Sequence, residues 1–188
     1  MTTVSVEPFL PRCAAPGDLA DWCAVFSDGH GELSGSSVQP SLLAKRLLAE
    51  DSSAMRWAGR GLAGTGVGGV AELRPQPHVP GAGFLRLFVA PTARRGGIGS
   101  VLLSRVMQCA ATTGMDQVQA TVPAGPPGEP FARALPICGY CCTWNFRNSG
   151  WIRSRCGATA RSWRRIRIRA IGWRIGPLPN RWSTPLGR

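Results

Sequence analysis

The 188-residue sequence predicts an α/β fold, and three features of its first three quarters support this. Apolar residues recur at helical spacing in two segments near the N-terminus. Residues 83–90 then form a strand pattern that is apolar on both faces, as expected at the centre of a sheet that is covered on both sides. A glycine-rich turn, a helix and another strand follow it directly, which is the element order of an α/β sheet.

The N-terminal third predicts a short strand and two helices. Residues 4–9 form the strand, and Asp18 is a candidate N-cap for the first helix. The apolar face of this helix consists of Leu19, Trp22, Cys23 and Phe26, and we expect the helix to end at Gly29-His30-Gly31. The apolar face of the second helix consists of Leu43, Ala44, Leu47 and Leu48.

Strand patterns dominate the middle of the chain. Residues 55–58 predict a short strand, residues 59–66 a glycine-rich turn, and residues 67–74 a second strand that ends at a proline pair. The strand at 83–90, GFLRLFVA, carries Arg86 as its only charge.

The elements after residue 96 predict a helix, a strand and the beginning of another helix. The first helix buries Leu102, Leu103, Val106, Met107 and Ala110 and stops near Gly114. Residues 118–122 alternate like a strand, and after a Pro/Gly linker residues 131–135 begin a further short helix.

The turn at residues 94–100, RRGGIGS, has the character of an anion-binding site. The first amides of a helix have no intrahelical partner, and the helix dipole adds partial positive charge there. Glycines at 96, 97 and 99 allow the backbone to approach a phosphate, and Arg94 and Arg95 can add charge-assisted hydrogen bonds. The alternative is a tight strand-to-helix turn with two solvated arginines. The turn is not a Walker loop, because no Gly-Lys-Ser/Thr follows it. It does not fit the dinucleotide fingerprint either, because its spacing differs and no early βαβ unit precedes it.

The segment FLRLFVAPTARRGGIGSVLL resembles the signature of the Gcn5-related N-acetyltransferases (GNAT). An apolar strand ends in Val-x-Pro, and Arg-x-x-Gly-x-Gly opens a helix, with Arg94, Gly97 and Gly99 at the three motif positions. The resemblance implies a mixed, mostly antiparallel sheet flanked by helices. It also implies that acetyl-CoA is the cosubstrate and that no metal is needed.

The resemblance further implies a set of cofactor-binding residues and direct transfer of the acetyl group to a small-molecule or peptide amine. The strand offers backbone groups to the pantetheine arm and the acetyl carbonyl, and the loop amides hold the diphosphate. The residues at these positions are Leu87, Phe88, Val89, Arg94, Arg95, Gly96, Gly97, Ile98, Gly99 and Ser100. No residue is assigned as the general base. Glu72 is a candidate, but the favoured interpretation is that its carboxylate simply faces solvent. The family's usual tyrosine acid has no clear counterpart, since Tyr140 lies in the tail and Phe131 stands near the expected place.

The charge of the chain is concentrated in its C-terminal part. The net charge is +12, yet residues 1–136 hold eleven basic and all ten acidic residues. Residues 137–188 hold eleven arginines, five tryptophans and no acidic residue. We therefore divide the chain into an incomplete acetyl-CoA-binding domain, 1–136, and a basic tail, 137–188, that we expect to be disordered.

The tail composition is typical of a GC-rich gene read one base out of register, which enriches Arg, Cys and Trp and depletes Lys, Asp and Glu. In the shifted frame Trp144-Asn145 must give Glu and Trp151-Ile152 must give Asp. We expect a frameshift close to Pro136, with the closing strands of the sheet missing or replaced. Uncovering one face of the sheet at about 25 cal/mol per Å² could cancel a stability of about 5–15 kcal/mol, so the encoded form is expected to have little activity.

Two other functions stay open. An Arg/Trp tail can bind nucleic acid, although the near-neutral front of the chain does not favour this. A non-catalytic acyl-CoA-binding module would bind without turnover. The Cys138-x-x-Cys141 spacing is a weak zinc motif, because neither a second pair nor a histidine follows. No apolar run is long enough to span a membrane and no secretory signal is evident, so a cytoplasmic location is expected.

Overall fold

The computed structural model describes residues 4–50, 53–61, 66–115, 117–122, 128, 130–131 and 165–169. Helices and strands follow the mixed order that the sequence predicts. In chain order they are β1 (Ser5–Pro8), η1 (Pro11–Cys13), α1 (Pro16–Ser34), α2 (Pro40–Ala49), β2 (Met55–Arg60), β3 (Gly69–Pro75), β4 (Ala82–Val89), η2 (Pro91–Ala93), α3 (Ile98–Thr112), β5 (Gln117–Thr121) and β6 (Arg165–Arg169).

The strands form one mixed sheet in the order β1-β2-β3-β4-β5-β6. All neighbouring strands are antiparallel except β4 and β5, which run parallel because α3 crosses over between them. The predicted fold class, a mostly antiparallel sheet flanked by helices, is therefore confirmed.

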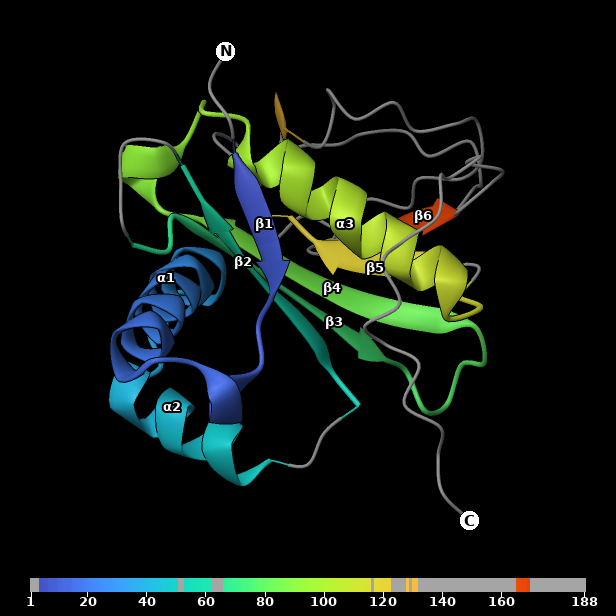
Figure 1. Ribbon diagram of the computed structural model, residues 1–188. Coiled ribbons are helices and arrows are strands. Elements are labelled where there is room, and N and C mark those ends of the chain that lie inside the picture. Colours follow the sequence, from blue (N-terminus) through green and yellow to red (C-terminus); the bar gives the residue numbers. More distant parts are fainter. Residues whose placement is uncertain are drawn as a thin grey trace.

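Helices cover both faces of this sheet (Figure 1). Helices α1 and α2 pack on one face, where Val70 joins their apolar cluster. Helix α3 packs on the other face, where Ala71 and Leu73 join its cluster. The side chains of successive β3 residues therefore pack into the cores on opposite faces of the sheet, because side chains alternate along a pleated strand. The prediction that the strand at 83–90 is central is confirmed, because β4 lies between β3 and β5 and contacts both α1 and α3.

The predicted start of the first helix is wrong. The helix begins at Pro16 with Ala15 as its N-cap, and no side chain caps it. Proline suits this first position because its fixed φ is already helical and its missing N–H has no acceptor there. Asp18 lies in the first turn instead, and its carboxylate pairs with Arg60 at 2.8 Å.

The predicted end of this helix is also wrong. Helix α1 continues through Gly29-His30-Gly31 to Ser34, and Gly35 ends it in the left-handed conformation with φ of 74°. Gly29 is buried against the ring of Phe88 in β4, where a Cβ atom would lie 2.3 Å from Cγ of that ring. This glycine therefore marks a close approach of helix and sheet and not a stop.

Three other segments differ from expectation or lie at least partly beyond the described residues. The turn expected at 59–66 begins later, because Gly59 and Arg60 belong to β2 and Gly59 pairs with Gly69. Residues 62–65 and most of the helix expected at 131–135 lie outside the described residues, although Phe131 is helical. Of the tail, β6 pairs antiparallel with β5, and the remainder of 137–188 lies outside the described part. The division at residue 136 stays a prediction.

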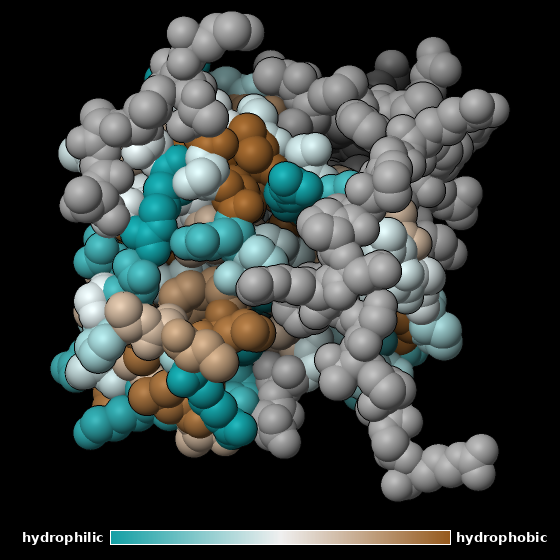
Figure 2. All heavy atoms as spheres, in the orientation of Figure 1, coloured by the Kyte–Doolittle hydropathy of each residue, from teal (hydrophilic) through white to brown (hydrophobic). Residues whose placement is uncertain are grey.

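The outer surface over α1 and α2 mixes apolar and polar side chains (Figure 2). Exposed large apolar residues in the described part of the chain are Leu10, Val38, Leu42, Leu48 and Val79. Exposed apolar residues of this kind are ordinary on protein surfaces. In the described part of the chain, no helix is both long and apolar enough to cross a membrane.

Candidate active site

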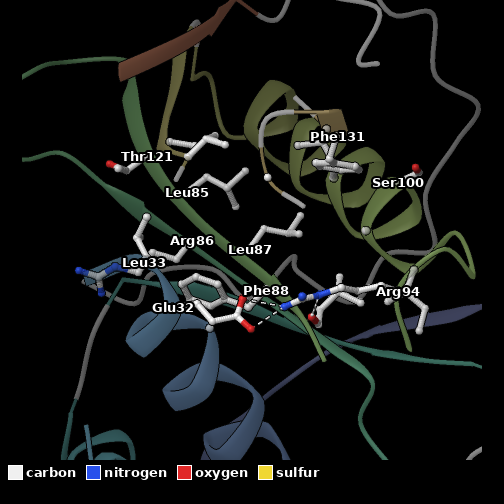
Figure 3. Close-up of a pocket in the computed structure, with 18 of the residues that line it drawn as sticks. Glu32, Leu33, Leu85, Arg86, Leu87, Phe88, Arg94, Ser100, Thr121 and Phe131 are labelled. Carbon is white, nitrogen blue, oxygen red and sulfur yellow. Dashed lines mark hydrogen bonds and ion pairs between the residues drawn. The ribbon is translucent and has the colours of Figure 1, made fainter. Parts of the chain in front are cut away.

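A cavity of about 440 Å³ opens where β4 and β5 separate. Its walls come from elements far apart in the sequence: the end of α1, the second half of β4, the first turn of α3, the end of β5 and the segment around Phe131. Figure 3 shows side chains from these elements gathered around the middle of β4. Because the cavity adjoins both a strand edge and a helix N-terminus, backbone groups from both are available to a ligand.

The strand edge is free because the pairing of β4 with β5 stops early. The last paired residues are Leu85 and Ala120, whereas β4 continues to Val89 with only β3 beside it among the described strands. The Gln117 N–H donates to the Gly81 oxygen, so odd-numbered residues of this stretch direct their hydrogen-bonding groups toward β5. By the same alternation, the backbone groups of Leu87 and Val89 face the cavity.

The loop after β4 presents the N-terminus of α3 to the same cavity. Gly97 is the N-cap in the left-handed conformation with φ of 84°, and Arg95 is also left-handed with φ of 66°. The first intrahelical bond runs from the Val101 N–H to the Gly97 oxygen at 3.1 Å. The amides of residues 98–100 therefore have no intrahelical acceptor, and an anion can satisfy them.

Helix α3 is held in place at its first residue. Ile98 is buried against Gly59 and Gly69, which face each other across β2 and β3. A Cβ atom at either glycine would come within 3 Å of the Ile98 side chain, at 2.8 Å for Gly59 and 2.6 Å for Gly69. The paired glycines thus form the depression into which the helix start fits.

Arg94 joins the loop to α1 and to the strand end. Its Nε donates to the Val89 oxygen at 3.0 Å, and its Nη2 pairs with the Glu32 carboxylate at 2.7 Å (Figure 3). The Arg94 side chain stays about one-quarter exposed, so it is within reach of a ligand in the cavity.

The structure brings nearly all of the predicted site residues to this cavity. Nine of the ten line it: Leu87, Phe88, Val89, Arg94, Arg95, Gly97, Ile98, Gly99 and Ser100. Gly96 belongs to the same loop but is not among the lining residues.

Sequence reasoning missed the wall that α1 supplies, where Gly29, Glu32 and Leu33 line the cavity. The one available signal was Gly29, since a glycine inside a helical pattern often marks a close approach.

The expectation that Glu72 faces solvent is wrong. Glu72 is buried at 3% exposure, and its Oε2 accepts from Arg56 Nε at 2.9 Å and from Arg74 Nη2 at 3.3 Å. The same guanidinium of Arg74 also hydrogen-bonds Glu50 and lowers the pKa of that carboxyl below its ordinary value, with burial opposing the shift. Glu72 does not line the cavity, so its role is to pair these charges. Tyr140 lies outside the described residues.

The family model described as "Acetyltransferase (GNAT) family" matches residues 21–134, which include the whole loop and cavity-lining strand. The chain belongs to the GNAT acetyltransferases. It is accordingly an acyltransferase by resemblance. No curated protein matches the chain.

Solved GNAT structures share the fold at low sequence identity. A GNAT-family protein of Desulfovibrio desulfuricans is 18% identical with a TM-score of 0.59, covering 89% of this chain and 99% of that one. YncA of Salmonella typhimurium, solved with its cofactor acetyl-CoA, is 16% identical with a TM-score of 0.60, covering 93% and 98%. A spermidine N-acetyltransferase chimera of the Vibrio cholerae and human enzymes is 15% identical with a TM-score of 0.58, covering 89% and 95%.

No group of three or more His, Cys, Asp or Glu side chains that could hold a metal ion occurs among the residues that the structure describes. The polar groups offered by the cavity are instead backbone amides and arginines, with Glu32 as the one described carboxylate in its wall. Such a set suits an anionic organic ligand better than a cation.

Proposed function

We propose that this GNAT protein transfers the acetyl group of acetyl-CoA to the amine of a small molecule or peptide. The observation that carries the proposal is that a helix N-terminus with free amides and a strand edge with free backbone groups meet in one cavity. In acetyl-CoA an extended pantetheine arm joins a diphosphate to a thioester. The diphosphate matches the helix N-terminus, and the arm with its thioester matches the strand edge.

In this proposal the loop binds the diphosphate. The amides of residues 98–100 point toward its oxygens, and Arg94 and Arg95 supply positive charge. Gly96 serves as part of the backbone turn and does not line the cavity. The helix dipole of α3 adds to the attraction, by about 0.3–1 kcal/mol for an exposed anion.

The free edge of β4 accommodates the reactive end of the cofactor. Backbone groups of Leu87 and Val89 hydrogen-bond the pantetheine arm and the acetyl carbonyl, whereas Phe88, whose backbone groups face β3, contributes to the cavity wall. The amine nitrogen attacks the carbonyl carbon, so that a C–N bond forms and the C–S bond breaks. The amine loses a proton, the leaving thiolate takes one up, and an N–H directed at the carbonyl oxygen stabilises the developing negative charge.

Structural neighbours support both the cofactor and the type of acceptor. YncA carries acetyl-CoA, and the Vibrio cholerae–human chimera is a spermidine N-acetyltransferase. At 15–16% identity these neighbours indicate the fold and do not identify the acceptor of this chain.

Binding of acetyl-CoA tests the proposal directly. A saturating concentration, about one hundred times Kd, should stabilise the full chain by about 2.7 kcal/mol and raise its Tm by about 5–10 °C. Pantetheine, which lacks the diphosphate, should bind much more weakly because it leaves the amides of the loop unoccupied. Calorimetric titration and thermal unfolding measure both ligands.

Absence of heat and of any Tm increase with acetyl-CoA would refute the proposal. Equal affinities for acetyl-CoA and pantetheine would refute the role of the loop. Binding without turnover of any amine, if it persists after the reading frame of residues 137–188 is restored, would instead favour a non-catalytic acyl-CoA-binding module.

We also propose that residues 137–188 are translated out of frame and that residues 1–136 form an incomplete domain. The nucleotide sequence around codon 136 tests this: restoring the frame should yield codons for a charge-balanced, strand-forming segment in place of the arginine-rich one. The frame-restored protein should turn over acetyl-CoA with an amine, whereas the encoded form should show little turnover. A shifted frame interrupted by stop codons, or robust turnover by the encoded form, would contradict the hypothesis.

A further inference from the structure

Arg86 is a cation in the cavity wall that the proposed cofactor does not use. It lies on β4, and its side chain points to the sheet face covered by α1, together with those of Phe84 and Phe88. The side chain is 39% exposed, which is more than that of any arginine paired with the same carboxylate. The guanidinium of Arg86 is therefore accessible to a ligand in the cavity.

The carboxylate that Arg86 contacts is shared with two other arginines. Oε2 of Glu72 accepts from Arg56 at 2.9 Å and from Arg74 at 3.3 Å. Arg86 reaches only Oε1, at 3.5 Å, the longest contact of the three. Arg56 and Arg74 also pair with Glu50, at 3.0 and 2.8 Å, whereas Glu72 is the one carboxylate that pairs with Arg86 among the described residues. The charge of Arg86 is therefore the least compensated of the three, and a guanidinium has five N–H donors to offer.

Aromatic rings hold the guanidinium where it is. Its central carbon lies 5.9 Å from the ring centroid of Phe26 and 5.7 Å from that of Phe84. A cation on aromatic faces is partly desolvated, which strengthens its attraction for an anion. The guanidinium is therefore preorganised for a ligand.

Arg86 and Arg94 lie on opposite sides of Leu87 and Phe88 (Figure 3). Arg86 precedes Val89 by three residues, so it lies about 10 Å along the strand from the loop end, where the diphosphate is proposed to bind. The thioester end of the cofactor is uncharged. An anion beside Arg86 must therefore belong to the acceptor.

We propose that Arg86 binds a carboxylate of the acceptor, so that the acceptors of this chain are amino-carboxylic acids. The inference rests on the proposed acetyl transfer. A single guanidinium fork matches the two oxygens and single charge of a carboxylate. Leu33 and Phe84 provide apolar surface next to it for the rest of the molecule.

Paired probes test the inference without requiring turnover. The common L-amino acids and their amides are titrated into the full chain saturated with CoA, which cannot donate an acetyl group. At least one acid should bind about tenfold or more tightly than its amide, because the amide lacks the charge-assisted hydrogen bonds. Arg86→Gln should abolish that difference, and Arg86→Lys should retain part of it.

Arg74→Gln is the matched control, since it also removes a partner of Glu72 but does not line the cavity. This variant should lower Tm and leave the preference for the acid intact. No acid–amide difference in any pair, or a difference that survives Arg86→Gln, would overturn the inference alone. Failure of CoA itself to bind would overturn the proposed function on which the inference rests.

Discussion

Replacing Gly97 by alanine should remove most of the affinity for acetyl-CoA. Gly97 is the N-cap of α3 with φ of 84°, a conformation that costs other residues about 1–2 kcal/mol. Relief of this strain would turn the amides of residues 98–100 away from a common ligand. Loss of one hydrogen bond to a charged group, about 1.5–3 kcal/mol, corresponds to a Kd about ten- to hundredfold higher, which calorimetric titration measures.

Gly114 offers a control at the other end of the same helix. It has φ of 74°, and a Cβ there would meet no atom within 4 Å, as at Gly97. Gly114→Ala should therefore cost similar stability in thermal unfolding while leaving the affinity for acetyl-CoA unchanged. Equal affinities of the two variants would show that the N-cap of α3 does not support the cofactor.

Replacing Gly29 by alanine should destabilise the protein. A Cβ there would lie 2.3 Å from Cγ of Phe88, whose ring packs edge-on against Phe26 with centroids 5.3 Å apart. The ring must move or α1 must shift away from β4. Overpacking of this kind costs about 1–3 kcal/mol, which lowers Tm by about 3–10 °C in thermal unfolding.

Gly31→Ala, two residues further along α1, should have the opposite effect. A Cβ there would meet only Ser37, at an ordinary distance of 3.5 Å. Alanine reduces the conformational entropy of the unfolded chain, so this variant should gain about 0.4–1 kcal/mol. If Gly29→Ala were as stable as Gly31→Ala, the packing of α1 directly on Phe88 would be contradicted.

Much of the fold could be predicted because local patterns agree with it. The strand at 83–90, the glycine turn and α3 are consecutive, so their order and types are legible in one stretch of sequence. The errors at α1 have tertiary causes. Gly29-His30-Gly31 looks like a helix stop, but the close approach of Phe88 requires a glycine inside a continuous helix.

The candidate site divides in the same way. The loop and strand residues are contiguous, and a motif can find them. No sequence motif could identify Glu32 as a site residue. Glu32 lies 62 residues from Arg94 along the chain and reaches it only because α1 packs beside β4. The burial of Glu72 depends on register, since Arg56 and Arg86 face it from the two neighbouring strands.

The packing of Ile98 on Gly59 and Gly69 lowers the entropic cost of binding an anion at the N-terminus of α3. The first turn of α3 is fastened to the middle of the sheet, so the donors it presents are already oriented before any ligand arrives. Little conformational entropy is then lost when an anion docks. A larger residue at either glycine would displace the first turn of α3 from the sheet. The first measurable effect would be a lower affinity for the anion.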